Sequence, residues 1–224
     1  MASESPPAFT RQPYTGSCHC GTIKYVVYLS LPPPSTPPSS LSLQTFAERS
    51  GLKIYRCNCT VCHKMSYFHL RLQSSPDDFV VLKPVEPKTP DDEGSGVSNY
   101  RCNKGVSKWY FCSTCGVRTF TIRGEKVTEE VELPTALLQK VGMVGEDAKE
   151  EMSKVKVWRC RKEGWSEWAP GFRPNYLSIN ATTLDVGQKG LDLRKWSEWG
   201  VIEYCDTLEM KGDWQSVPHE GGMY

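Results

Sequence analysis

Short runs of β-branched and aromatic residues recur along the chain and predict a mainly β fold. The first run, TIKYVVYL, spans residues 22–29, and such runs are typical of strands. Similar composition predicts further strands at 53–56, 68–73, 79–83, 99–102, 108–111, 117–123, 176–185 and 201–206. Two of these, 99–102 and 108–111, are expected to pair as the arms of a hairpin.

One region changes from this pattern to a helical one. Pro134 suits the first turn of a helix, and the residues TALLQKVG follow it. Residues 146–155 are charged and carry apolar positions at helical spacing. We therefore expect a helical insertion over 126–157. A short helix is also expected at 43–49, ended by Gly51.

The remaining segments suggest one domain with polar or low-complexity additions. Residues 1–13 are polar and contain proline, which predicts a loose N-terminus. The run LPPPSTPPSS lies inside a Pro-rich insertion at 30–52. We expect the domain itself to span 14–210, interrupted by this insertion and by the helical one, with a C-terminal tail over 211–224.

Charge and apolar content exclude several classes of protein. The 224 residues include 27 basic and 26 acidic side chains, and this net charge of +1 argues against a nucleic-acid partner. Apolar residues make up 38%, which allows a packed core. No run approaches the length of a membrane span, and no secretory signal is visible. We therefore expect no membrane partner and a cytoplasmic, or alternatively nuclear, protein.

The chain has ten cysteines, and seven of them form three clusters. In a reducing compartment, clustered cysteines bind metal or carry out chemistry more often than they form disulfides. Thiolates suit zinc, which prefers four ligands, and catalytic zinc sites typically keep one position open. Seven sulfurs divide naturally into four and three, which suggests one structural and one reactive zinc. The clusters are Cys18 and Cys20, then Cys57, Cys59 and Cys62, then Cys112 and Cys115.

The spacing of the clusters suggests how they combine. The middle cluster, here called the triad, lies within six residues and suffices for one site. The two outer pairs must then meet as a zinc clasp, which would join the first strand to the hairpin after residue 108. Three alternatives stay open: Cys102 closes the triad as a fourth ligand, the pair Cys112 and Cys115 is redox-active, or the cysteines are buried free thiols.

Together with their flanking residues, the clusters resemble a known family. Its pattern is GSCHCG before a strand, then C-x-C-x-x-C-[HR]-K, then [YF]-F-C-x-x-C-G-x-x-x-F, with a later strand that ends in Leu-Asp. The matching segments are 16–25, 57–64, 110–120 and 180–185. Over roughly 14–125 and 155–210, the chain resembles the glutathione-dependent formaldehyde-activating enzymes, a family that also contains centromere protein V.

This resemblance implies a β-tent fold of stacked antiparallel sheets. It implies a structural zinc at the clasp and a catalytic zinc at the triad, and therefore two zinc ions per chain. The activity for which the family is named is the addition of glutathione to formaldehyde. Small residues usually follow the family's triad, whereas this chain has Met65, Ser66, Tyr67 and Phe68 there. If they line the open side of the zinc, this bulk suggests a larger electrophile than formaldehyde.

The leading functional hypothesis is zinc-dependent thiol chemistry of the carbon–sulfur lyase type. Three thiolates leave a zinc ion with a net charge of about −1, which suits the binding of an incoming thiol. A glutathione-like thiolate would add to, or leave from, a carbonyl compound. Candidate acid–base residues are His63, Tyr67 and His69. Candidate contacts for glutathione carboxylates are Arg56, Lys64, Arg71 and Arg118.

Two other functions remain possible from the sequence. A zinc-dependent lyase, hydrolase or isomerase could act on a larger small molecule. Alternatively, both zinc ions could be structural in a non-catalytic module that binds a protein. No other catalytic motif is present, since H-E-x-x-H, G-x-S-x-G and phosphate-binding loops are all missing from the sequence.

Overall fold

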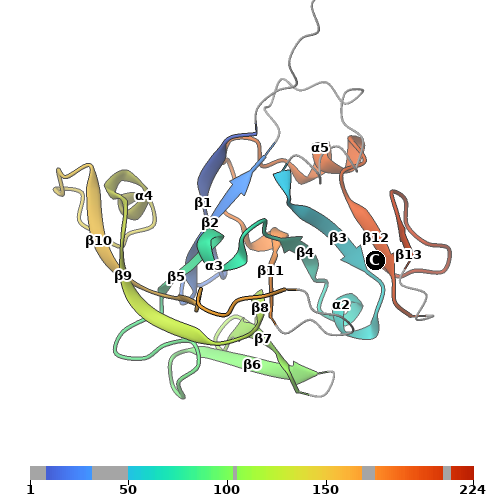
Figure 1. Ribbon diagram of the computed structural model, residues 1–224, viewed down its shortest axis with the longest axis horizontal. Coiled ribbons are helices and arrows are strands. Elements are labelled where there is room, and N and C mark those ends of the chain that lie inside the picture. The colour runs from blue at the N-terminus through green and yellow to red at the C-terminus, as the bar shows by residue number, and fades with distance from the viewer. Residues whose placement is uncertain (1–8, 32–49, 103–104, 168–174, 209–212) are drawn as a thin grey trace, which may run out of the picture.

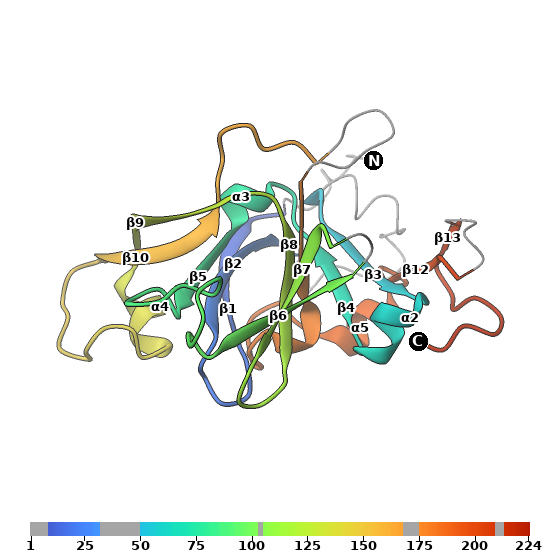
Figure 2. The same ribbon diagram turned by 90° about the horizontal axis from the view of Figure 1, so that it is seen from below.

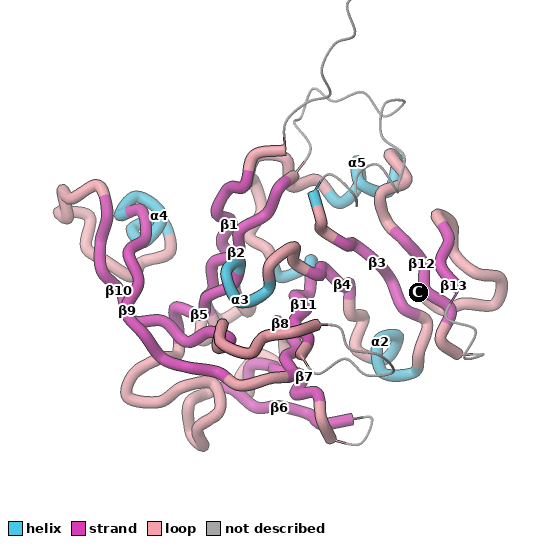
Figure 3. Tube along the Cα trace, viewed as in Figure 1, coloured by secondary structure: helices cyan, strands magenta, loops and turns pink. Residues whose placement is uncertain are grey.

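The structure has strands where the sequence pattern predicts them. Strand β5 (Phe79–Lys83) has the expected bounds, and the runs at 22–29 and 53–56 become β2 (Lys24–Ser30) and β3 (Lys53–Cys57). The expectation of a mainly β fold is confirmed, as the distribution of strands in Figure 3 shows. The computed structural model describes residues 9–31, 50–102, 105–167, 175–208 and 213–224.

Two β-sheets carry the fold (Figures 1 and 2). The first sheet is antiparallel, in the order β1 (Arg11–Ser17), β2, β5, β10 (Met152–Cys160) and β9 (Lys126–Pro134). The second sheet has the order β13 (Asp213–Gln215), β12 (Glu203–Asp206), β3, β4 (Phe68–Arg71), β11 (Tyr176–Asn180), β8 (Arg118–Arg123), β7 (Ser107–Cys112) and β6 (Val97–Cys102). Its pair of β12 with β3 is parallel.

The helices of the described residues are short. They are α2 (Thr60–Lys64), α3 (Ser75–Asp78), α4 (Thr135–Lys140), α5 (Leu193–Glu198) and a 3-10 turn at Ala181–Thr183. None of these helices has the length and apolar character needed to cross a membrane.

The main core lies between the facing sides of the two sheets. Successive side chains of a strand point to opposite faces, so alternate residues of β2 enter this core. The ring of Tyr25 lies 5.5 Å from Phe79 within the first sheet. It also lies 6.4 Å from Phe120, which belongs to the second sheet. These aromatic contacts join the two sheets across the interior.

A second, smaller apolar cluster covers the other face of the first sheet. Val26 and Val157 point to this face, where Leu138 of α4 is fully buried against the strands. Helix α4 therefore packs on the β9–β10 hairpin that it connects (Figure 1).

The expected helix at 146–155 is wrong, because β10 begins at Met152 and no helix spans those residues. The nine residues of β10 pair with all nine of β9. Within β10, Val155 and Val157 alternate with lysines, a spacing that also suits a strand. Pairing with β9 thus decides in favour of a strand over a helix. The helix expected after Pro134 does form as α4, with Pro134 as its N-cap residue.

Two strands of the described residues, β1 and β13, lie in segments for which the sequence predicted no strand. The loose N-terminus expected over 1–13 is wrong for its last part, because β1 begins at Arg11 and pairs with β2. The expected tail over 211–224 contains β13, which pairs with β12. The helix expected at 43–49 and most of the Pro-rich insertion lie outside the described residues.

Helix α5 offers a first test of the local structure. The carboxylate of Asp192 accepts hydrogen bonds from the backbone N–H groups of Arg194 and Lys195, at 3.1 Å and 3.0 Å. Replacing Asp192 with alanine is expected to lower the free energy of unfolding by about 1 kcal/mol, because the first turn loses its cap. Chemical denaturation measures this loss. The control, Ser197→Ala at an exposed position of the same helix, should stay within about 0.5 kcal/mol of the parent. Equal losses of stability in Asp192→Ala and Ser197→Ala would contradict the role of the cap.

Candidate metal centres

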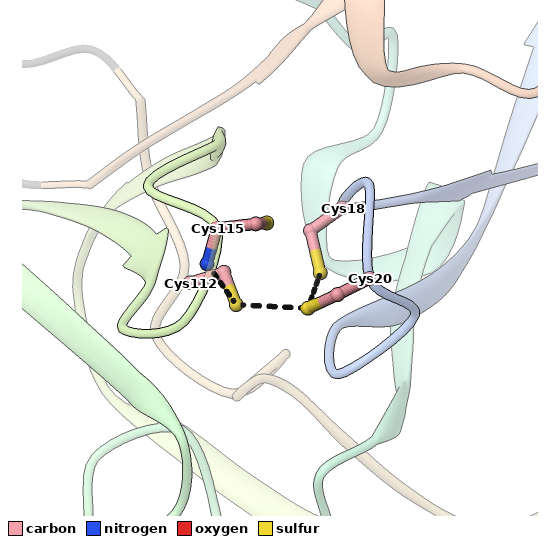
Figure 4. Close-up of side chains that lie close together, drawn as sticks. All are labelled: Cys18, Cys20, Cys112 and Cys115. Carbon is pink, nitrogen blue, oxygen red and sulfur yellow. Dashed lines mark hydrogen bonds between the residues drawn. The ribbon is translucent and has the colours of Figure 1, made fainter.

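The clasp is assembled from two turns that face each other. Cys18 and Cys20 lie in the turn from β1 to β2, whereas Cys112 ends β7 and Cys115 lies in the turn to β8 (Figure 4). Their four sulfurs all lie within 4.8 Å of one another and could hold a metal ion. The expected meeting of the two outer pairs is therefore confirmed. Because the turns belong to different sheets, the clasp joins the sheets.

The geometry of the clasp fits a tetrahedral set of thiolates. The sulfurs of Cys20 and Cys18 are 3.7 Å apart, and those of Cys20 and Cys112 are 3.4 Å apart. Four sulfurs about 2.3 Å from one zinc ion would be spaced by about 3.8 Å. Backbone N–H groups also point at the sulfurs, from Ile23 to Cys18 at 3.2 Å and from Cys115 to Cys112 at 3.5 Å. Such donors stabilise the thiolate form.

The thiols of the clasp differ in their acidity. A hydrogen bond with the Thr22 hydroxyl, at 3.2 Å, lowers the pKa of Cys20 to about 6. Burial instead raises the pKa of Cys18 to about 12. In the absence of metal, the exposed Cys20 therefore loses its proton more readily than the buried Cys18.

The triad forms where β3 passes into α2. Cys57 ends the strand, Cys59 caps the helix, and Cys62 lies in the helix. This strand-to-helix turn brings the three sulfurs within 4.8 Å of one another, so that they could hold a metal ion. The backbone N–H of Cys62 donates to the Cys59 sulfur at 3.4 Å. Cys57 and Cys59 are partly exposed, whereas Cys62 is buried.

Hydrogen bonds among the three sulfurs favour a single thiolate, at Cys59. Hydrogen bonds with Cys57 and Cys62 lower the pKa of Cys59 to about 2. Hydrogen bonds with Cys57 and Cys59 raise the pKa of Cys62, and the hydrogen bond with Cys59 raises that of Cys57, so these two thiols keep their protons more readily in the metal-free protein. The triad therefore holds a thiolate even before a metal binds, as a cation site requires.

The C-terminal part of the second sheet supports the triad, a contact that the sequence did not suggest. The Thr207 hydroxyl lies 3.0 Å from the Cys57 sulfur. The buried Asn58 side chain accepts from the backbone N–H of Thr207 at 2.8 Å and donates to the carboxylate of Asp206 at 2.8 Å. Because about 150 residues separate the two segments, no local pattern could have revealed this contact.

His69 is the candidate acid–base residue that the structure brings to the triad. Its Nε2 lies 3.1 Å from the Cys62 sulfur. Its Nδ1 lies 2.9 Å from the Ser178 hydroxyl and 3.2 Å from the Tyr176 hydroxyl. Burial lowers the pKa of His69 to about 3, so the ring is neutral near pH 7. Ser178 and Tyr176 were not singled out from the sequence, although their spacing by two places them on one face of β11.

Tyr67 and Phe68 do not form an open wall. Both side chains are only 2% exposed, and Phe68 belongs to the core between the sheets. The Tyr67 hydroxyl donates to the Ser178 carbonyl at 2.8 Å, and burial raises its pKa well above the ordinary value. Their bulk therefore gives no reason to expect a larger substrate. His63 follows Cys62 in α2 and is half-buried.

The candidate glutathione contacts have different surroundings. Arg71 is paired with Glu167, and its guanidinium lies 5.1 Å from the centre of the Tyr176 ring. Arg56 lies over the Phe68 ring at 4.7 Å, Arg118 lies over the Phe111 ring at 5.2 Å, and Lys64 is exposed. Arg71 is thus engaged by an internal carboxylate, unlike the exposed Lys64.

Cys102 lies near the triad and outside its set of sulfurs. It packs in the same apolar cluster as Cys62 and Tyr67. The Trp109 indole N–H donates to the Cys102 sulfur at 3.1 Å. In the described residues, the group of mutually close ligand atoms contains the three triad sulfurs and neither Cys102 nor His69.

Among solved structures, the chain has a distant similarity to a bacterial protein. No model of a known protein family matches the chain. A crystal structure of a Rhodobacter sphaeroides protein is similar over 78% of this chain and 90% of that chain, with 14% sequence identity and a TM-score of 0.37. So distant a similarity identifies neither a family nor an activity.

Proposed function

We propose that the protein is a zinc-dependent enzyme of thiol chemistry, of the carbon–sulfur lyase type. The observation that carries this proposal is the unequal number of ligands in the two sites. In the described parts of the chain, the clasp has four sulfurs and the triad has three. Four thiolates complete a structural zinc site, whereas three leave a position for a substrate. The resemblance of the cysteine motifs to the formaldehyde-activating enzymes supports the same assignment.

The proposed substrates are a glutathione-like thiol and a carbonyl compound. Zinc at the triad supplies a position at which a thiol loses its proton. In the forward direction the thiolate sulfur forms a bond to the carbonyl carbon, and the carbonyl oxygen takes up a proton; elimination reverses both changes. Cys57 and Cys59 are partly exposed, so the triad is accessible from solvent to a small thiol. Arg56 and Lys64 are the cations proposed to meet its carboxylates.

A second candidate is a zinc module without catalytic activity. The observation that favours it is the 3.1 Å approach of His69 Nε2 to Cys62, because a histidine that joined three cysteines would close the site. In that case no position would remain for a substrate thiol.

Zinc content tests the proposed function directly. The parent is expected to contain two zinc ions per chain, and Cys59→Ala is expected to contain one and to keep its fold, because the clasp is untouched. Elemental analysis and circular dichroism measure both properties. The matched Cys102→Ala variant should keep two ions. In the cobalt-substituted parent, added glutathione should change the absorption spectrum, and Cys59→Ala should lose this response.

Two results would contradict the proposal. One zinc ion in the parent, unchanged in Cys59→Ala, would mean that the triad holds no metal. Two ions with no response to glutathione or other small thiols would favour the non-catalytic module.

A further inference from the structure

His69 of β4 is held beside the triad by residues of the two neighbouring strands, β3 and β11. Its ring stacks on Tyr55, with centres 4.4 Å apart and planes within 3°. Its Nδ1 contacts the hydroxyls of Ser178 and Tyr176, and the Tyr176 hydroxyl lies 2.7 Å from that of Tyr55. His69 is 3% exposed and Ser178 is fully buried. These contacts fix the orientation of the ring, and Nε2 therefore faces the Cys62 sulfur.

The hydrogen-bonding capacity of the two side chains decides which atom donates in the contact between His69 and Cys62. If the triad holds a metal, as the proposed function requires, Cys62 is a thiolate and can only accept a hydrogen bond. An Nε2 lone pair at 3.1 Å from a thiolate would be repelled, so Nε2 must carry the hydrogen. Nδ1 can accept from either of its two hydroxyl neighbours. The arrangement resembles the way in which outer residues orient and tune metal ligands.

We propose that His69 is a positioning residue that donates a hydrogen bond from Nε2 to the Cys62 thiolate and is not itself a metal ligand. This bond withdraws electron density from one of three thiolates. It thereby offsets the excess negative charge that three sulfurs place on a divalent ion, and an additional thiolate binds more readily. The role rests on the proposed function of the triad, and it assigns to His69 neither proton transfer nor direct contact with substrate.

Cobalt substitution of the full chain tests this role. His69→Phe keeps an aromatic ring against Tyr55 and removes the donor, whereas His69→Gln keeps an N–H donor. Cys59→Ala is made in the parent and in each His69 variant, so that cobalt binds only at the clasp. Subtracting the spectrum of each such protein from that of the protein with the intact triad leaves the absorption bands of the triad. The Phe variant should move the thiolate-to-cobalt charge-transfer band to lower energy, because the sulfur becomes more electron-rich. It should also weaken zinc binding at the triad by about 10- to 100-fold in chelator competition. The Gln variant should recover part of both effects.

A second variant covers the case in which His69→Phe does not fold. Ser178→Ala leaves His69 in place and removes one of the hydroxyls that orient it. It should shift the band and the zinc affinity in the same directions, by a smaller amount.

The outcomes separate this proposal from the proposed function. If the parent and Cys59→Ala take up equal cobalt, the triad holds no metal and both proposals fail. If the triad binds cobalt but the Phe variant keeps the parent's band and zinc affinity, only the hydrogen-bond role fails. If X-ray absorption shows a nitrogen ligand in the parent that the Phe variant lacks, His69 is a ligand. That result would overturn the role and favour the closed, non-catalytic site.

Discussion

Replacing Cys112 with alanine is expected to lower the free energy of unfolding by more than about 4 kcal/mol, enough to unfold much of the protein. Structural zinc sites contribute roughly 10–16 kcal/mol of apparent binding energy, and a folded domain is stable by only about 5–15 kcal/mol. The Cys112 sulfur is fully buried, and the clasp connects turns that belong to different sheets. Without the clasp, these two turns lose the metal link between the sheets, and the apolar core with a few polar contacts, such as that of Tyr25 with Thr183, must hold the sheets together.

Thermal unfolding followed by circular dichroism, together with zinc analysis, measures this effect. The matched control is Cys160→Ala, since Cys160 is also fully buried but belongs to neither group of sulfurs. It should cost about 1 kcal/mol and leave the zinc content unchanged. A chelator should destabilise the parent and the control, but should have little further effect on Cys112→Ala. If Cys112→Ala and Cys160→Ala unfold at the same midpoint temperature, the clasp is not the main connection between the two sheets.

The strands could be predicted from the sequence wherever one face of a strand enters the core. The run Phe79–Lys83 is buried along nearly its whole length, and its composition alone sufficed. The helix expected over 146–155 does not form, because the apolar positions there fit both a helix and a strand and pairing with β9 favours the strand from Met152 on. Strand β13 lacks an apolar run and forms by pairing with β12.

The candidate metal sites likewise have a part that the sequence predicts and a part that it does not. The cysteines of each cluster are neighbours in sequence, so the triad followed from spacing, and the meeting of the two outer pairs followed by elimination once the triad was taken as one site. The contacts from Thr207 to Cys57 and from Ser178 to His69 join segments more than 100 residues apart. Such contacts depend on the order of strands in the second sheet, which no local pattern encodes. The two groups of cysteines that could hold a metal ion were therefore predictable, and the residues that surround them were not.

Replacing Gly16 with alanine is the second change with a large expected effect. Gly16 on β1 lies directly opposite Tyr25 on β2, and the Tyr25 ring covers it. A Cβ at Gly16 would lie 2.2 Å from Cζ and 2.3 Å from the hydroxyl oxygen of Tyr25, far inside contact distance. The ring cannot move freely, because it is fully buried and its hydroxyl lies 2.8 Å from that of Thr183. We expect a loss of about 3 kcal/mol from overpacking and a broken buried hydrogen bond.

A double-mutant cycle with Tyr25→Leu distinguishes this clash from a general cost of alanine in β1. Leucine lacks the outer ring atoms and the hydroxyl that the new methyl group would meet. In the Tyr25→Leu background, Gly16→Ala should therefore cost less than about 1 kcal/mol by chemical denaturation, although Tyr25→Leu is itself destabilising. Residues in contact show such non-additivity, whereas independent sites do not. If Gly16→Ala costs the same in both backgrounds, the Tyr25 ring does not occupy the space above Gly16. The loss of stability would then come from alanine in the β1 backbone itself and not from a clash with the ring.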